Sequence, residues 1–298
     1  MGHKRQHYVP SSYVRAWCDP DCPPGQTPYV WRFPKNGGAP RKKSPEKLFR
    51  RTDMYTVRTK DGQRDLTLET NLSRLEGVFT KLRRDKLDKR APLTPEERLY
   101  LCMFVAAMVG RTPSHGEHTS RQWKRVLDMG ERMQRAMEEA TDEQRANMVA
   151  MATTSEPGED DGFSMEEVER IVEQPIQEML GSTVTGLGPM LFEMPFVVVE
   201  TSVAPGFITS DDPCVWYDPA NYRTPVPRFA GGLGSPTIEI NMPLSPKQML
   251  MFGHGRVRPG TYVRLDNQLF VNALNNRARR FAHEYFVSSR KKARAAWF

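Results

Sequence analysis

The stretch TPEERLYLCMFVAAMVGRTP, residues 94–113, predicts the helix around which much of the chain should pack. Its start has the features of a helix N-terminus, because Thr94 can cap free backbone amides, Pro95 suits the first turn and Glu97 can bond back to the cap. Residues 99–109 are apolar on nearly every side, so this helix should be buried. Pro113 should end it, since proline lacks the backbone N–H that a helix interior needs.

Further helices are predicted on both sides of this segment. Over residues 66–90, apolar side chains return at alternating steps of three and four, which places them along one stripe. Residues 119–150 are Met-rich and amphipathic. Ser164 and Glu167 form a second capping box, and the helix that they open should kink or end at Pro175. The middle of the chain is therefore predicted to be mainly helical.

Strands are expected on either side of this helical middle. Residues 29–33 are rich in aromatic and β-branched side chains and run into a Pro/Gly hairpin turn. After residue 195, the same signal predicts strands at 196–200, 206–210, 214–217, 237–242 and 248–253. Asp266 should cap a final helix over 267–288. These patterns predict an α+β fold, a mainly helical middle packed against a mostly antiparallel sheet, with residues 1–298 in a single domain and 153–163 as a mobile loop.

The composition is that of a basic chain. Lys and Arg number 43 against 36 Asp and Glu, and the basic residues cluster at 41–43, 50–51, 83–84, 277–280 and 290–292. This excess favours nucleic acid or another polyanion as partner, although a solubilising surface has the same composition. Four cysteines are typical of a reducing compartment, and no run reaches the roughly 20 apolar residues of a membrane span. We therefore expect a cytoplasmic protein with no membrane anchor. The sequence does not predict its oligomeric state.

Three candidate site residues lie in the first third of the chain, one near its start and two on the helix predicted over 66–90. His7, flanked by Tyr8 and near Arg15, can carry a proton or bind a metal near neutral pH, or it can hold the terminus by bonding a backbone carbonyl. Glu69 and Glu76 are seven residues apart, so they project in nearly the same direction. They could share a cation or a substrate, or they could border an exposed helix face.

Two further candidates follow the buried helix. Arg111 at its end could clamp a phosphate in a bidentate manner, or it could complement the helix dipole. In the block 206–213, Asp211 with Thr209 and Ser210 could bind a hard cation or supply a base at a strand end. The same composition also suits an ordinary turn in which these side chains cap backbone amides.

Familiar catalytic signatures are missing. His3-x3-His7 with Cys18-x3-Cys22 superficially resembles a zinc site, but its spacing fits no common zinc finger, so zinc is not expected. The motifs of P-loop nucleotide hydrolases, dinucleotide-binding dehydrogenases, zinc proteases and α/β-hydrolases do not occur.

Several of these sequence blocks, taken in their order along the chain, resemble a large bacterial family of unknown function. The blocks that carry the resemblance are Gln6–Pro10 with Tyr13 and Arg15, Glu69 and Glu76 around Leu72, Arg111–Pro113, Phe207–Pro213 and Pro243–Pro246. Members usually have leucine in place of Val14 and phenylalanine in place of Trp17. The resemblance implies one compact domain and singles out His7, Glu69, Glu76, Arg111 and Asp211, but it supplies no activity.

A histidine, carboxylates and an arginine together suit metal-assisted or acid–base attack on a phosphodiester. We therefore expect a nuclease-like hydrolase. Its catalytic residues would be His7, Arg111 and Asp211, its substrate contacts Tyr8, Arg15, Thr209 and Ser210, and its ligands for Mg²⁺ or Mn²⁺ Glu69, Glu76 and Asp211. Two alternatives stay open, a non-catalytic nucleic-acid-binding module and an enzyme that acts on a nucleotide or small anionic metabolite.

Overall fold

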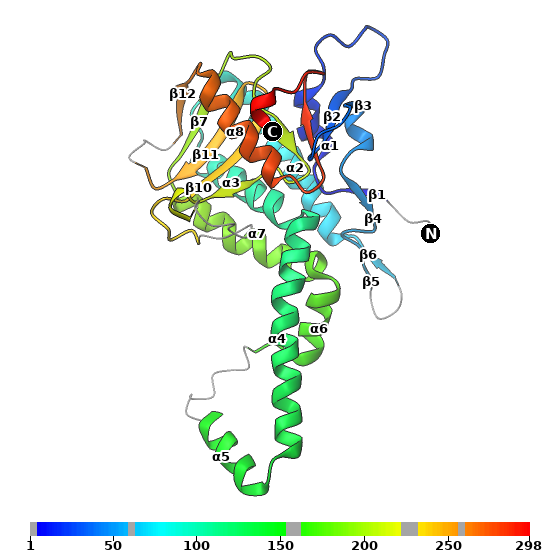
Figure 1. Cartoon of the computed structure of the whole chain (residues 1–298), viewed down its shortest axis with the longest axis vertical. Helices are drawn as coiled ribbons and strands as arrows, with labels where there is room; N and C mark the ends of the chain where they lie inside the picture. Colours follow the sequence, from blue (N-terminus) through cyan, green and yellow to red (C-terminus); the bar gives the residue numbers. More distant parts are fainter. Residues whose placement is uncertain (1–4, 59–62, 153–161, 222–231, 256–259) are drawn as a thin grey trace.

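The structure is a computed structural model that describes residues 5–58, 63–152, 162–221, 232–255 and 260–298 (Figure 1). Residues 153–161 of the predicted loop lie outside these ranges. Among the described helices, none is both long enough and apolar enough to cross a membrane.

The predicted buried helix is α3 (Pro95–Gly110), and its start forms as expected. The Thr94 side chain accepts from the Glu97 amide at 3.2 Å, while the Thr94 amide donates to the Glu97 carboxylate at 2.8 Å. Helix α3 packs against α2 (Thr67–Asp85) on one side and α7 (Pro175–Glu193) on another. The rings of Phe79 and Phe104 stack with centroids 3.7 Å apart, which joins α2 to α3.

An arm of helices extends from this body (Figure 1). Thr112 caps α4 (Pro113–Glu139), so Pro113 begins a new helix directly where α3 ends. The single helix predicted over 119–150 is wrong, because α4 stops and α5 (Asp142–Ala152) follows. The cause is local, since Thr141 and Gln144 bond to each other's backbone amides as a helix start. Helix α6 (Met165–Glu173) opens at the predicted Ser164 cap and packs against α4.

The strands of the described residues form two larger sheets and two short ribbons, and they are mostly antiparallel as predicted. In the five-stranded sheet, only the β12–β7 pair is parallel, and the order is β12 (Thr261–Arg264), β7 (Phe196–Glu200), β11 (Gln248–Gly253), β10 (Glu239–Ser245) and β9 (Val215–Tyr217). The four-stranded sheet runs β3 (Arg41–Lys43), β2 (Val30–Pro34), β13 (Tyr285–Ser288) and β8 (Thr209–Ser210). The ribbons pair β1 (Arg5–His7) with β4 (Arg50–Thr52) and β5 (Val57–Arg58) with β6 (Arg64–Asp65). Short helical segments are α1 (Ser11–Val14) and the 3-10 turns Arg15–Trp17, Pro45–Lys47, Leu87–Lys89, Pro219–Asn221 and Ala295–Trp297.

The last helix is shorter than predicted. Helix α8 covers Gln268–Phe281, and Asn267 caps it by accepting from two backbone amides. Asp266 instead accepts from the Ser202 amide at 2.6 Å. Residues 285–288, predicted as helix, are strand β13, because pairing with β2 and β8 outweighs any local helical preference there.

The N-terminal block is buried between the helices and the strands. The Tyr13 hydroxyl lies 2.8 Å from the Thr209 hydroxyl and donates to the Pro243 carbonyl at 2.6 Å. The Trp17 indole donates to the Phe207 carbonyl at 2.8 Å. Position 206, shortly before β8, requires glycine. Gly206 has a φ of +86°, and a Cβ there would lie 2.0 Å from the carbonyl oxygen of Pro246.

Candidate functional site

Arg111 lies at the centre of a buried polar cluster. Its side chain is 2% exposed, and its Nη1 lies 2.8 Å from a carboxylate oxygen of Glu76. Its Nε donates to the Tyr55 hydroxyl at 3.1 Å and its Nη2 to the His7 carbonyl at 2.7 Å. Burial lowers the pKa of Arg111, but Tyr55 and Glu76 outweigh this effect, so the pKa is raised overall. The charged guanidinium therefore joins the end of α3 to α2 and β1, with its donors directed inward.

Glu69 reaches the same cluster through Gln6. The Gln6 amide group donates to Glu69 at 3.0 Å and to the Thr56 hydroxyl at 3.2 Å, and its oxygen accepts from the Tyr55 amide at 2.7 Å. The structure thus brings together Glu69, Glu76, Arg111 and the backbone of His7, which the sequence had singled out. Gln6 and Tyr55 complete the cluster. Gln6 belongs to the Gln6–Pro10 block, but neither residue was predicted as a site residue, because their partners lie in other segments.

The His7 imidazole contacts the Pro45–Lys47 turn, whereas the backbone carbonyl of His7 contacts Arg111. Its Nε2 lies 3.2 Å from the Glu46 carbonyl oxygen, and the ladder of the β1–β4 ribbon pairs His7 with Arg50. Burial is the main cause that lowers the pKa of His7, and the contact with the Glu46 carbonyl opposes it. The imidazole is therefore neutral near pH 7 and lies beside an arginine.

Asp211 is held by backbone amides. Its carboxylate accepts from the amides of His283 and Glu284, both at 2.7 Å, and of Tyr285 at 2.9 Å. Burial raises its pKa to about 6, although the three donors favour the charged form, and the neighbouring Asp212 raises it further. Asp211 thereby anchors the start of β13. This arrangement corresponds to the alternative in which the side chains of block 206–213 cap backbone amides.

The three predicted metal ligands are not gathered at one place. Within the part of the chain that the structure describes, no group of three or more His, Cys, Asp or Glu side chains is arranged to hold a metal ion. Glu69 and Glu76 belong to the Arg111 cluster, whereas Asp211 lies against the amides before β13.

The predicted substrate contacts also separate. Thr209 and Ser210 are buried, and they bond Tyr13 and the Asp212 backbone. Arg15 is 62% exposed and pairs with Glu46 at 2.8 Å. Tyr8 is half-buried, burial raises the pKa of its phenol, and it lines the pocket described next.

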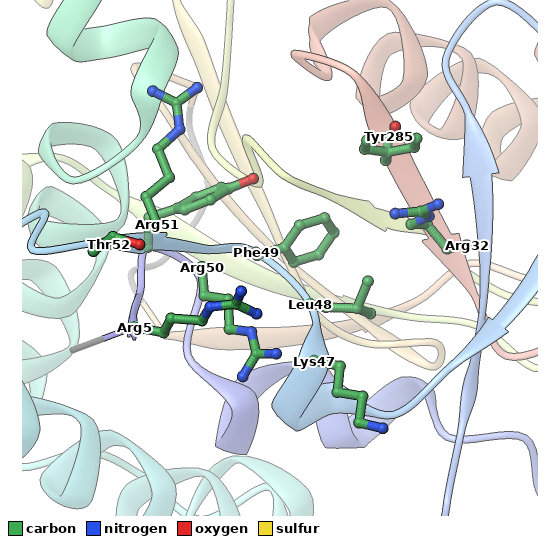
Figure 2. A pocket seen from close by; sticks show the side chains of 10 residues that line it. Arg5, Arg32, Lys47, Leu48, Phe49, Arg50, Arg51, Thr52 and Tyr285 are labelled. Carbon is green, nitrogen blue, oxygen red and sulfur yellow. The ribbon is translucent and has the colours of Figure 1, made fainter. Parts of the chain in front are cut away.

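A pocket of about 390 Å³, here called the basic pocket, opens between the β1–β4 ribbon and the four-stranded sheet. Its lining residues are Arg5, Tyr8, Arg32, Lys47, Leu48, Phe49, Arg50, Arg51, Thr52 and Tyr285. Five of them are cationic and none is acidic. Figure 2 shows Arg5 and Arg50 pointing to one side of the ribbon and Arg51 to the other, with Arg32 and Tyr285 on the neighbouring sheet.

The cations of the basic pocket have no acidic partner within the part of the chain that the structure describes. Among the described residues, none of the five forms an ion pair, whereas Arg111 and Arg277 each contact a glutamate. The Arg32 guanidinium instead lies 4.0 Å from the centroid of the Tyr285 ring. Arg32 is also directly opposite Arg41 in the β2–β3 ladder, and like charges at paired positions are destabilising. Cations gathered in this way create a positive local potential, which attracts anions.

Only part of this pocket is visible in the sequence. The run at 50–51 is a recognisable basic cluster, but Arg5 and Arg32 are separate cations in the sequence. Pairing of β1 with β4 brings Arg5 near this run, and Arg32 lines the same pocket from the four-stranded sheet. Tyr285 falls in the segment predicted to be helical.

Comparison with known proteins identifies the family but no function. A family model described as "Protein of unknown function (DUF4238)" matches residues 5–292, so the chain belongs to this family, in agreement with the resemblance of its sequence blocks. No curated protein and no solved structure matches the chain.

Proposed function

Because membership of this family assigns no activity, we propose from the site itself that the protein binds nucleic acid through phosphate groups in the basic pocket. One observation carries the proposal: five cationic side chains line this pocket, no acidic residue does, and within the described residues none of the five has an ion-pair partner. Such side chains bind phosphates and release condensed counterions, which makes binding favourable at low salt. Tyr8 and Tyr285 add ring surfaces on which a base can stack.

The charges around the pocket favour several phosphates rather than one. Guanidinium groups bind phosphate oxygens in pairs, and four of the five cations are arginines. Across β2 and β3, Arg41 is exposed beside Arg32, so the positive surface continues beyond the pocket. A phosphate placed between Arg32 and Arg41 would relieve their repulsion.

Binding to labelled oligonucleotides at low and moderate salt tests this function. If the five cations contact phosphates of a single strand, affinity should fall about 100-fold between 50 and 200 mM salt. The double variant Arg50→Ala/Arg51→Ala should weaken binding and flatten this salt dependence. Arg132→Ala/Arg135→Ala, on the helical arm, removes the same charge outside the pocket and serves as control. Absence of binding at low salt, or equal weakening by both double variants, would count against the proposal.

Hydrolysis of the bound nucleic acid is the second candidate, and the position of His7 favours it. The ladder of the β1–β4 ribbon puts His7 on the same face as Arg5 and Arg50. Because its pKa is lowered, the imidazole can accept a proton at neutral pH, as a general base must.

Cleavage assays with labelled DNA and RNA test this second candidate. They should be run with Mg²⁺, with Mn²⁺ and with a chelator, which also tests the metal expected from Glu69, Glu76 and Asp211. His7→Gln should abolish cleavage and keep binding, whereas Arg50→Ala should weaken both. Cleavage that persists in His7→Gln would contradict the assigned role.

A further inference from the structure

A second pocket, here called the mixed pocket, adjoins the basic pocket. It has a volume of about 540 Å³ and is lined by the end of β4 and by residues of α4, α6 and α7. Arg51 and Thr52 line both pockets. The two cavities are therefore neighbours that meet at the end of β4.

The chemistry of the mixed pocket differs from that of the basic pocket. Its lining includes the apolar side chains of Met54 and Ile176, which are 7% and 8% exposed. Gln177 and Arg121 supply hydrogen-bond donors, and the carboxylates of Glu117 and Glu173 supply acceptors. Such a lining suits a flat group with apolar faces and both donors and acceptors on its edge. The bases of nucleic acids have these properties, whereas a phosphate would be repelled by the carboxylates.

We propose that the two pockets form one site for a single-stranded nucleic acid, with phosphates in the basic pocket and an unpaired base in the mixed pocket. This inference rests on the proposed function and specifies its ligand. A duplex keeps its bases stacked and paired, so it cannot place one in the mixed pocket without breaking pairs. The positive surface that continues to Arg41 favours a strand of several nucleotides over a single nucleotide.

The binding experiment compares four ligands on the full chain at one salt concentration. They are a single strand of about ten nucleotides, the same strand without bases, the matching duplex and a mononucleotide. The intact single strand should bind about tenfold more tightly than the baseless strand and than the duplex, because only it offers a base to the mixed pocket. The mononucleotide should bind most weakly.

A blocking variant locates the effect. Gln177→Trp fills the mixed pocket without changing charge, and it should weaken binding of the intact strand about tenfold while leaving the baseless strand unchanged. Gln134→Trp, exposed on α4 outside the pocket, is the matched control. Equal affinity for intact and baseless strands, for single strand and duplex, or for strand and mononucleotide would overturn the two-pocket site and leave phosphate binding in place. If no ligand bound even at low salt, both this inference and the proposed function would fail.

Discussion

Replacing Asp211 with alanine removes one acceptor from three backbone amides at the start of β13. A hydrogen bond to a charged group contributes about 1.5–3 kcal/mol. Two effects reduce the sum, because water can reach the half-buried amides and because the variant no longer buries a carboxylate. We therefore expect the free energy of unfolding to fall by about 3 kcal/mol. Asp211→Asn should lose nearly as much, since its NH₂ group would face amide donors.

Urea denaturation, followed by circular dichroism, measures this loss, and thermal melting should show a Tm lower by roughly 5–10 °C. Asp128→Ala is the matched control, because this aspartate is exposed on α4 and should change stability by less than about 0.5 kcal/mol. If Asp211→Ala unfolded at the same urea concentration as the unaltered chain, the three hydrogen bonds would not be what holds β13.

Three further changes test other contacts. Arg111→Met should lower the free energy of unfolding in urea by about 3–5 kcal/mol, because it breaks a buried charge cluster. Arg84→Met, at an exposed arginine, should lower it little, and similar losses in the two variants would contradict a stabilising role of the cluster. Gly206→Ala should leave almost no folded protein, because its Cβ would meet the carbonyl oxygen of Pro246. Gly181→Ala, with open space around it, should be tolerated. A well-folded Gly206→Ala would contradict the close approach of Gly206 to Pro246. Burial lowers the pKa of His115 to about 4, so the unfolded chain takes up a proton between pH 6.5 and 4 that the folded chain does not. The free energy of unfolding should therefore fall by about 3 kcal/mol as pH drops through this window. His115→Gln should flatten that fall in urea titrations at each pH, and an unchanged slope would contradict the role of His115.

Elements with local signals were predicted well. The capping boxes at Thr94 and Ser164 form as expected, because a helix start depends on residues three positions apart. Strand β13 was missed for the opposite reason. Its start is held by Asp211, more than 70 residues earlier; of its two neighbours, β8 contains residues next to Asp211, and β2 lies much farther away, near the start of the chain. No window of the sequence around 285 contains that information.

The candidate site shows the same division. Spacing on α2 placed Glu69 and Glu76 on one side, and both do reach the cluster around Arg111. What spacing does not convey is direction, and the donors of Arg111 are turned toward the protein interior. The basic pocket depends on the pairing of β1 with β4 and on the packing of this ribbon near β2, so its cations are separated in the sequence.

The burial of the N-terminal block has a consequence for synthesis of the chain. Tyr13 precedes its partners Thr209 and Pro243 by 196 and 230 residues. Since a ribosome adds about 5–20 residues per second, roughly 10–45 s pass before those partners exist. During that time Phe79 and Phe104 can shelter Tyr13, but its hydroxyl and the Trp17 indole have no acceptor from the strands. A translational pause before residue 243 would prolong this exposure and favour chaperone binding or aggregation over folding.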